Sequence, residues 1–327
     1  MAGAPAARLW TRGGRVTVLT TDLGDGVHAI DTQMHGYRGI TAGYVVLADR
    51  PCLVETGTAR SAPAVADALT SLGVGAADLA TVVVTHIHLD HAGGVGDIAR
   101  RYPNAEVVVH ERGARHLVDP ARLMRSARMV YGTALDELFG PLLPTEQERV
   151  VALGERGRID LGGDRELTSY YSPGHAQHHV GLLDSQSGDL YVGDAAGIYI
   201  PEVDVLRPGT PPPDFDLDTA LSSLDLFASL QPKRLLFSHF GPLERPLESL
   251  QRAKEEMQSW VGLVRETRAA GLDLDHAVAM VRDRTSERYA ALLADPALEA
   301  KFEELNATAT NIVGINRWLD SLEATPT

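Results

Sequence analysis

Cysteine is nearly absent from this chain of 327 residues, which contains only Cys52. One cysteine can form neither an internal disulfide nor a zinc site built from several thiolates, so any metal site must use other ligands. Aromatic residues make up only 6% of the sequence, so small and aliphatic side chains are expected to fill the core. Cys52 lies in an apolar stretch and is predicted to be a buried strand residue.

Long apolar runs are also missing. No stretch comes close to the roughly 18 consecutive apolar residues that cross a bilayer. Residues 1–15 lack the apolar segment of a signal peptide and are expected to form a flexible N-terminal tail. We therefore expect a cytoplasmic protein without a membrane partner.

Basic residues are in deficit. The chain has 30 Lys and Arg against 44 Asp and Glu, which gives a formal net charge of −14. Such a surface repels the phosphate backbone of DNA and RNA, so nucleic acid is excluded as an expected partner. A small-molecule substrate remains as the expected partner.

The order of predicted elements indicates an α/β fold. Short strands alternate with helices in the first half of the chain, as in layered α/β proteins. Residues 112–140 interrupt this pattern with a helical insertion, which we expect to lie over a site. Residues 247–327 are predicted to be a helical C-terminal subdomain, with breaks near Gly271, Pro296 and Gly314 and a surface that could support a homodimer.

Chemistry-bearing residues concentrate in residues 85–94, with the sequence THIHLDHAGG. His86 and His88 flank one residue of a segment that follows a predicted buried strand, so an extended backbone can direct both imidazoles the same way. Asp90 and His91 lie on the turn that follows. Imidazole and carboxylate are ligands that zinc and iron favour, so the cluster predicts a metal site.

Three more predicted strands end in the same residue types. His175 follows Pro-Gly, Asp194 follows Gly193, and His239 follows Ser238. Active sites of layered α/β folds gather at such loops, so these side chains are expected to join the first cluster.

An HxHxDH motif, a downstream His after Pro-Gly, a Gly-Asp and a late His together resemble the pattern of the metallo-β-lactamase superfamily. The resemblance covers about residues 41–241 and is strongest to the glyoxalase II-like (hydroxyacylglutathione hydrolase-like) subgroup. It implies a four-layer αββα sandwich over residues 16–246, with the helical insertion and the helical C-terminal extension added. By position, it implies seven metal ligands: His86, His88 and His175 for a first ion, Asp90, His91 and His239 for a second, and Asp194 for both.

The same resemblance implies the cofactor and the reaction. Two divalent metal ions are expected, with zinc first and iron or manganese as alternatives. A metal-bridging hydroxide would attack an ester-like bond, and Asp90 and Asp194 would act as catalytic residues that hold the geometry. Thioester substrates are favoured because a thiolate leaves without a general acid, and the sequence identifies no such acid. Where the family usually has Asp, this chain has Glu55, which we expect to support a ligand.

Substrate contacts are predicted at three positions. Tyr131 lies in the insertion, Tyr199 follows Asp194 by five residues, and Arg317 lies in the C-terminal helices. Each also has a plainer interpretation: Tyr199 as a core residue, and the other two as parts of solvated helix faces.

Other functions share this ligand pattern. A lactonase or another carboxylic-ester hydrolase would use the same residues. A phosphodiesterase acting on RNA fits the acidic charge poorly, and an iron-dependent sulfur dioxygenase would differ in its metal. A β-lactamase is disfavoured by the chain length and the lack of an export signal. A non-catalytic scaffold is difficult to reconcile with seven intact ligand positions.

Overall fold

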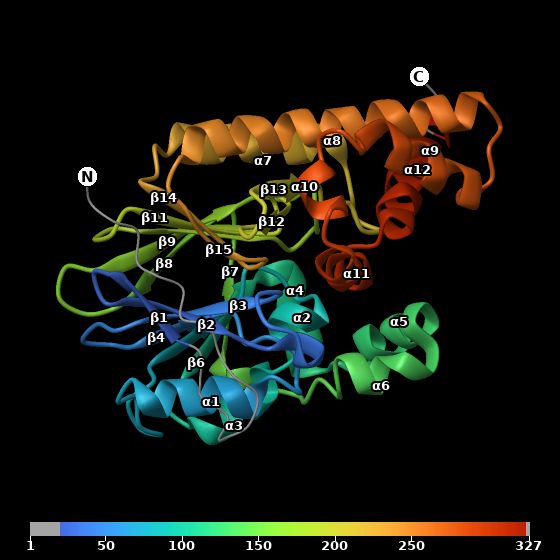
Figure 1. Cartoon of the computed structure of the whole chain (residues 1–327). Coiled ribbons are helices and arrows are strands. Elements are labelled where there is room, and N and C mark those ends of the chain that lie inside the picture. Colours follow the sequence, from blue (N-terminus) through green and yellow to red (C-terminus); the bar gives the residue numbers. More distant parts are fainter. Residues whose placement is uncertain (1–19, 325–327) are drawn as a thin grey trace.

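Two β-sheets packed face to face form the centre of the protein, and helices cover the outer face of each sheet (Figure 1). The computed structural model describes residues 20–324. The order of layers is helix, sheet, sheet, helix, which confirms the predicted four-layer α/β architecture. The predicted N-terminal tail, residues 1–15, lies outside the described residues.

The first sheet has seven strands in sequential order. Strands β1 to β4 are antiparallel, and β4 to β7 run parallel. The strands are β1 (Thr20–Gly24), β2 (Val27–Asp31), β3 (Ala42–Val46), β4 (Cys52–Val54), β5 (Thr81–Val83), β6 (Glu106–His110) and β7 (Val150–Leu153). Helices α1 (Ala62–Ser71), α2 (Leu89–Ala92) and α3 (Val95–Arg101) connect the parallel strands, and α1 and α3 lie below this sheet in Figure 1.

The second sheet has six strands in the order β15-β14-β11-β10-β9-β8. Its strands are β8 (Arg156–Asp160), β9 (Glu166–Tyr171), β10 (Val180–Asp184), β11 (Asp189–Gly193), β14 (Arg234–Phe237) and β15 (Gly241–Leu243). A separate hairpin consists of β12 (Ile198–Ile200) and β13 (Val205–Arg207). Helix α7 (Leu217–Ser229) covers the outer face together with the long helix α8 (Pro246–Ala269).

Three apolar cores hold the layers together. One lies between the sheets and includes Tyr44, Cys52 and Tyr191, all buried. The second joins the first sheet to α1 and α3, and the third joins the second sheet to α7, α8 and the later helices. Because α8 shares this third core with α7, the predicted boundary at residue 246 runs through one continuous core, and a separate C-terminal subdomain stays a prediction.

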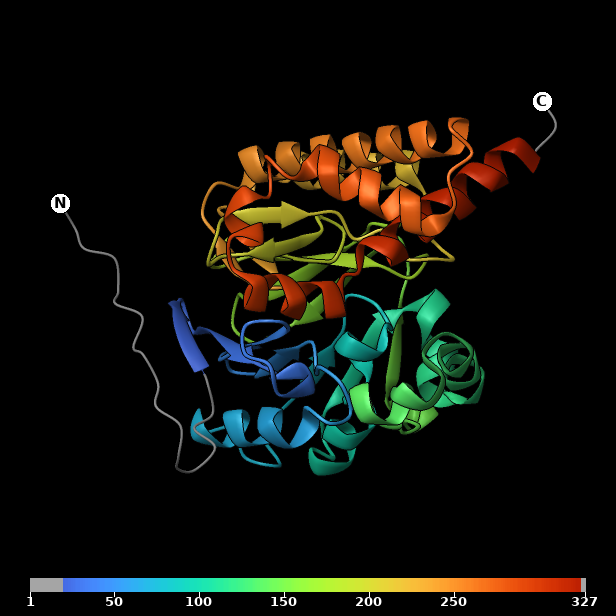
Figure 2. The same ribbon diagram turned by 45° about the vertical axis from the view of Figure 1, so that its right-hand side comes forward.

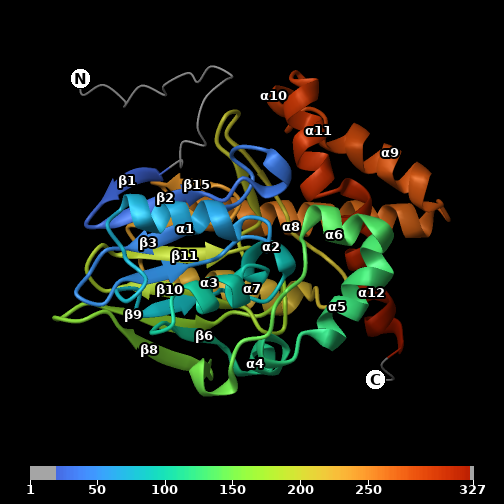
Figure 3. The same cartoon turned by 90° about the horizontal axis from the view of Figure 1, so that it is seen from below.

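The predicted insertion forms a group of short helices beside the sandwich (Figure 2). It contains α4 (Glu111–Val118), α5 (Ala121–Tyr131), a 3-10 turn (Gly132–Ala134) and α6 (Leu135–Leu138). Seen from below, α5 and α6 lie at the same end of the molecule as the C-terminal helices (Figure 3). The two groups of helices therefore flank one end of the sandwich.

The C-terminal helices after α8 are α9 (Leu274–Thr285), α10 (Ala290–Leu293), α11 (Pro296–Leu305) and α12 (Thr308–Ala324). The predicted breaks near Gly271 and Pro296 are confirmed. The break near Gly314 is wrong, because α12 continues through this residue. A Cβ at position 314 would lie 1.9 Å from the carbonyl oxygen of Thr210, so this glycine allows a close approach between backbones. None of the helices within residues 20–324 has the length and apolar character needed to span a bilayer.

Candidate metal centre

Four strand ends meet at the end of the sandwich where the two helical groups lie. His86 and His88 follow β5, and α2 then carries Asp90 and His91. The three other positions follow strands of the second sheet: His175 after β9, Asp194 after β11 and His239 after β14. The structure therefore brings all seven predicted ligand residues together.

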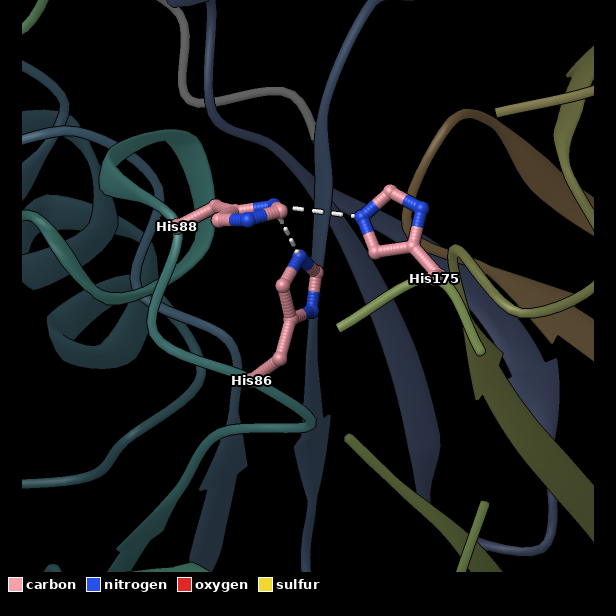
Figure 4. A group of neighbouring side chains, drawn as sticks. All are labelled: His86, His88 and His175. Atoms are coloured by element: carbon pink, nitrogen blue, oxygen red, sulfur yellow. Dashed lines mark hydrogen bonds between the residues drawn. The ribbon is translucent and has the colours of Figure 1, made fainter. Parts of the chain in front are cut away.

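The first group of ligand atoms belongs to His86, His88 and His175. His86 Nε2 lies 3.0 Å from His88 Nδ1, and His175 Nε2 lies 3.1 Å from the same His88 nitrogen. The three rings converge on one point, two from the segment after β5 and one from the segment after β9 (Figure 4). With metal–nitrogen bonds of about 2.0–2.1 Å, ligand atoms at tetrahedral positions lie roughly 3.3 Å apart, so the observed spacing suits a metal ion.

The second group belongs to Asp90, His91 and His239. His91 Nε2 and His239 Nε2 lie 3.2 Å apart. Asp90 Oδ2 lies 3.4 Å from His91 Nε2 and 3.3 Å from His239 Nε2. These distances of 3.2–3.4 Å are slightly longer than the 3.0 and 3.1 Å spacings of the first group.

Asp194 lies between the two groups. Its Oδ2 atom is 3.5 Å from His175 Nε2, in the first group, and 3.5 Å from His91 Nε2, in the second. Its Oδ1 atom is 3.5 Å from His239 Nε2. Within residues 20–324, this buried Oδ1 atom has no hydrogen-bond partner. A buried carboxylate oxygen left in this way points to a missing cation.

The ring nitrogens that face away from the site have partners that fix the tautomer. His175 Nδ1–H donates to the carbonyl oxygen of Gly209 at 3.1 Å, and His239 Nδ1–H donates to that of Ile40 at 2.8 Å. Because a carbonyl only accepts, each ring in its neutral form must carry its proton on Nδ1, which leaves the Nε2 lone pair directed at the site. The backbone thus prepares both imidazoles for metal binding.

Electrostatics differ between the two groups. Burial lowers the pKa of His175 to about 4 and lowers the pKa of His86 well below its usual value, so both are neutral near pH 7. For His91, burial acts in the same direction, but Asp194 and Asp90 outweigh it and hold the pKa well above the usual value. The same balance raises the pKa of His239 to about 9. The carboxylates of Asp90 and Asp194 therefore favour positive charge at the second group.

These observations together show that the residues of the two groups fit divalent metal ions. The donors are imidazole nitrogens and carboxylate oxygens, and each group of three has its ligand atoms within 4.8 Å of one another. Zinc, iron and manganese accept this ligand set, whereas a site for calcium or magnesium would consist of oxygen atoms.

Two further residues lie next to the ligands. Glu55 accepts a hydrogen bond from the Thr85 backbone N–H at 3.0 Å, and its other carboxylate oxygen lies 3.5 Å from His91 Nδ1. His179 accepts from the Asp194 backbone N–H at 3.3 Å, while its Nδ1–H donates to Ser172 Oγ. Glu55 thus lies beside a ligand ring, and its supporting role stays a prediction.

His178, to which the sequence assigned no role, faces the same cavity as the ligands. Its Nδ1 atom accepts a hydrogen bond from the Ile87 backbone N–H at 3.3 Å. Burial lowers its pKa well below the usual value, so the ring is neutral and carries its proton on Nε2. His178 can therefore donate one hydrogen bond. The run of three histidines within residues 175–179 was the available signal for it.

The C-terminal helix α12 supports the first group through a loop. Asn311 Oδ1 accepts from the Thr210 backbone N–H at 2.7 Å and from Thr210 Oγ1 at 2.9 Å. Asn311 Nδ2 donates to Asn306 Oδ1, and Asn306 Nδ2 donates to the carbonyl oxygen of Pro208. The carbonyl group of Gly209, which orients His175, lies between these anchored residues.

A cavity of about 720 Å³ opens beside the ligand groups. Side chains of the insertion line one side of it, and residues of the hairpin, of the Pro-rich loop after it (residues 208–213) and of α11 and α12 line the other. Tyr131 is part of the lining, and its ring packs against Phe139 at a centroid distance of 4.8 Å. Tyr131 is 44% exposed, but partial burial and the nearby Asp90 raise its pKa to about 12, so its hydroxyl stays protonated near neutral pH.

Two predicted substrate contacts lie away from this cavity. In strand β12, Ile198 lines the cavity, so the next side chain points the other way. Tyr199 accordingly packs against Phe237, with its phenol group beside Asp204. Arg317 is exposed on α12, outside the cavity lining.

Comparisons with known proteins agree with this geometry. The sequence model of the metallo-beta-lactamase superfamily matches residues 36–239. A metallo-beta-lactamase fold-containing protein, ST1585 of Sulfurisphaera tokodaii, is 32% identical over 184 residues, which cover 54% of this chain and 68% of that protein. Its crystal structure superimposes with a TM-score of 0.61 at 26% identity over 72% of this chain and 87% of that one.

Two relatives with named activities match shorter regions. A hydroxyacylglutathione hydrolase of Synechocystis sp. is 30% identical over 135 residues, 40% of each protein. An N-acyl homoserine lactonase, AttM of Azorhizobium caulinodans, is 30% identical over 113 residues, 35% of this chain and 38% of the lactonase. Because the family match covers more than half of the chain and includes all seven ligand positions, this protein belongs to the metallo-beta-lactamase superfamily, whose members are hydrolases.

Proposed function

We propose that this protein is a hydrolase that holds two divalent metal ions, zinc in the first instance, and cleaves a thioester. The observation that carries the proposal is the position of Asp194, whose carboxylate reaches ligand atoms of both groups. His86, His88 and His175 would hold one ion, while Asp90, His91 and His239 would hold the other. Bound there, the two ions would supply a water of lowered pKa and would polarise the carbonyl oxygen of the substrate.

The residues of the chain provide the rest of the chemistry. Asp90 lines the cavity, so it can accept a proton while it holds its place beside His91 and His239. His178 Nε2–H and the Tyr131 hydroxyl face the same cavity as neutral donors. Neutral donors at this position would stabilise negative charge as it develops on the substrate oxygen.

The choice of bond depends on the leaving group. A thiolate departs without protonation, so a thioester needs none of the cavity residues as a general acid. The hydrolase among the relatives is named for hydroxyacylglutathione, which is a thioester, and this supports the same substrate class here. A lactone is the second candidate, because the named lactonase is equally similar over a comparable region. Opening a lactone releases an alkoxide, which His178 or Tyr131 would have to protonate.

Parallel assays test the proposal. The zinc-loaded protein is given S-hexanoyl mercaptoethanol and hexanoyl homoserine lactone at equal concentrations, and release of thiol or acid is measured. We expect the thioester to have the higher kcat/KM, and a higher value for the lactone would favour the second candidate. His88→Ala should lose hydrolysis of both while keeping its circular dichroism spectrum. His276→Ala, on the exposed face of α9, is the matched control and should keep the hydrolysis of both substrates. Turnover retained by His88→Ala would rule out the assigned centre as the catalyst.

A further inference from the structure

Basic side chains gather at one end of the cavity, in a protein whose overall charge is strongly negative. Arg112, Arg115 and His116 of α4 and Arg122 of α5 all line the cavity, and we call these four residues the basic rim. Apart from the metal-ligand positions, the carboxylates of the cavity lining are Glu111 and Asp214. The lining outside the metal-ligand positions thus contains three guanidinium groups and two carboxylates.

The guanidinium groups of the basic rim have no carboxylate partner within 4.0 Å among residues 20–324. Arg115 donates instead to His116 Nε2 at 3.2 Å, and the Arg112 guanidinium lies over the ring of Tyr171 at 5.6 Å. Burial, followed by Arg115 and Arg122, lowers the pKa of His116. Like charges held this close repel one another, and a bound anion would remove that repulsion.

The position of Arg122 adds to the attraction of this end of the cavity for an anion. It is the second residue of α5, where the helix dipole favours negative charge, and the first turn of this helix contains no acidic residue. Asp119, two residues before Ala121, accepts from the Ala121 N–H at 3.1 Å, which places one carboxylate before the first turn. A guanidinium and a helix N-terminus nevertheless both attract an anion at the same end of the cavity.

The second half of α5 presents apolar side chains to the cavity. Ala127, Val130 and Tyr131 line it, and Val130 is 74% exposed. Arg122 and Val130 are eight residues apart, which corresponds to about 12 Å along the helix axis. An anionic group and an apolar chain could therefore bind along one helix at about that separation.

Metal-ligand positions line the same cavity as both halves of α5, because His88 and Asp90 belong to its lining together with Arg122 and Val130. At the basic end, His178 lines the cavity with His116, and its ring lies at a centroid distance of 5.9 Å from the His88 ring. At the apolar end, Tyr131 lines the cavity together with Asp90. A substrate that lies along α5 would thus pass the ligand groups between its two ends.

We propose that the substrate carries an anionic oxygen group, a carboxylate or a phosphate, that binds the basic rim, and an apolar chain that lies along the second half of α5, with the scissile bond between them. This rests on the proposed function and names the chemical class of its substrate. Arg112, Arg115 and Arg122 then determine specificity without taking part in bond cleavage.

Four probe thioesters test the proposal. Hexanoyl thioesters of 3-mercaptopropionate and of 2-mercaptoethyl phosphate carry the anion on the thiol, as carboxylate or phosphate. The adipoyl thioester of 2-mercaptoethanol carries it on the acyl part, and S-hexanoyl mercaptoethanol is neutral. We expect at least one anionic probe to have a KM about tenfold or more below that of the neutral probe. The probe with the lowest KM shows whether the anionic group is a carboxylate or a phosphate, and whether it lies on the thiol part or the acyl part of the substrate.

Variants connect this preference to the basic rim. In Arg115→Gln/Arg122→Gln the KM of the preferred anionic probe should rise about tenfold relative to the KM of the neutral probe. Arg125→Gln is the matched control, because Arg125 is exposed on the same helix but outside the cavity lining. Raising the salt concentration from 0.05 to 0.5 M should reduce the difference in KM between the anionic and the neutral probe for the unmodified protein.

A binding measurement keeps this inference separate from the proposed function. S-hexyl 3-mercaptopropionate, a thioether that cannot be hydrolysed, should bind the unmodified protein and Arg125→Gln alike in calorimetry, and about tenfold more weakly to Arg115→Gln/Arg122→Gln. Equal binding by all three, or equal KM values for charged and neutral probes, would overturn the inference. Binding that follows the prediction without any thioester turnover would instead count against the proposed function alone.

Discussion

Replacing Asn311 with alanine tests whether the C-terminal helices position a metal ligand. The substitution removes the acceptor of the buried Thr210 backbone N–H and the donor to Asn306 Oδ1. Thr210 Oγ1 keeps its bond to the carbonyl oxygen of residue 311, at 3.1 Å, so one buried backbone donor is the main group left without a partner. That loss costs about 1–3 kcal/mol. We expect the free energy of unfolding of the metal-free protein to fall by this amount.

The same change should reach the metal centre. When the loop from Pro208 to Thr210 relaxes, the Gly209 carbonyl no longer holds the His175 ring at a fixed angle. Loss of a partner that orients a metal-binding histidine lowers metal affinity about 10- to 100-fold. Since Asn311 acts on that partner indirectly, we expect about tenfold weaker zinc binding at the first group only, which corresponds to about 1.4 kcal/mol.

Competition with a chromogenic chelator measures both zinc affinities. Asn316→Ala, also on α12, is the control, because this side chain contacts Arg268 and does not reach the loop. If Asn311→Ala lowered stability and left both zinc affinities equal to those of Asn316→Ala, the helix would only cover the site and the positioning argument would fail.

Two further predictions use other parts of the structure. Metal uptake near pH 7 should release protons, because His91 and His239 carry raised pKa values, about 9 for His239, and must lose their protons to bind a cation. The metal affinity of the second group should therefore fall as the pH drops below about 9. The metal affinity of the first group, where the pKa of His175 is about 4, should stay constant down to about pH 5. Calorimetry in buffers of different ionisation enthalpy measures the proton release and both affinities. Gly314→Ala should lower the midpoint of thermal unfolding, because the added methyl group would clash with the Thr210 carbonyl oxygen. Gly262→Ala in α8 is the control: its methyl group meets open space, so the free energy of unfolding should rise by about 0.5–1 kcal/mol.

The metal ligands could be predicted from the sequence because their signal is local. His86 to His91 lie within six positions, and each remaining ligand follows a recognisable strand. Strand ends in a layered fold converge whatever the details of the connections, so residue type and order were enough to assemble the site. The helices of the insertion could be predicted from periodicity for the same reason.

Features that depend on tertiary contacts could not be predicted. The short strands β7, β12, β13 and β15 have three or four residues each, too few for an alternating pattern to be distinguished. Gly314 resembled a helix break because only the neighbouring Thr210 explains it. The direction of Tyr199 depends on the pairing of β12 with β13, and the cavity lining depends on how the insertion folds back.

Metal content tests the central claim most directly. The account predicts that the purified protein, saturated with zinc and dialysed, retains two ions per chain by atomic emission. His88→Ala should retain one, because the second group keeps all of its ligands. Asp194→Ala should weaken both sites, since its carboxylate reaches both groups. A protein that retains no zinc, or the same amount in all three forms, would contradict the account.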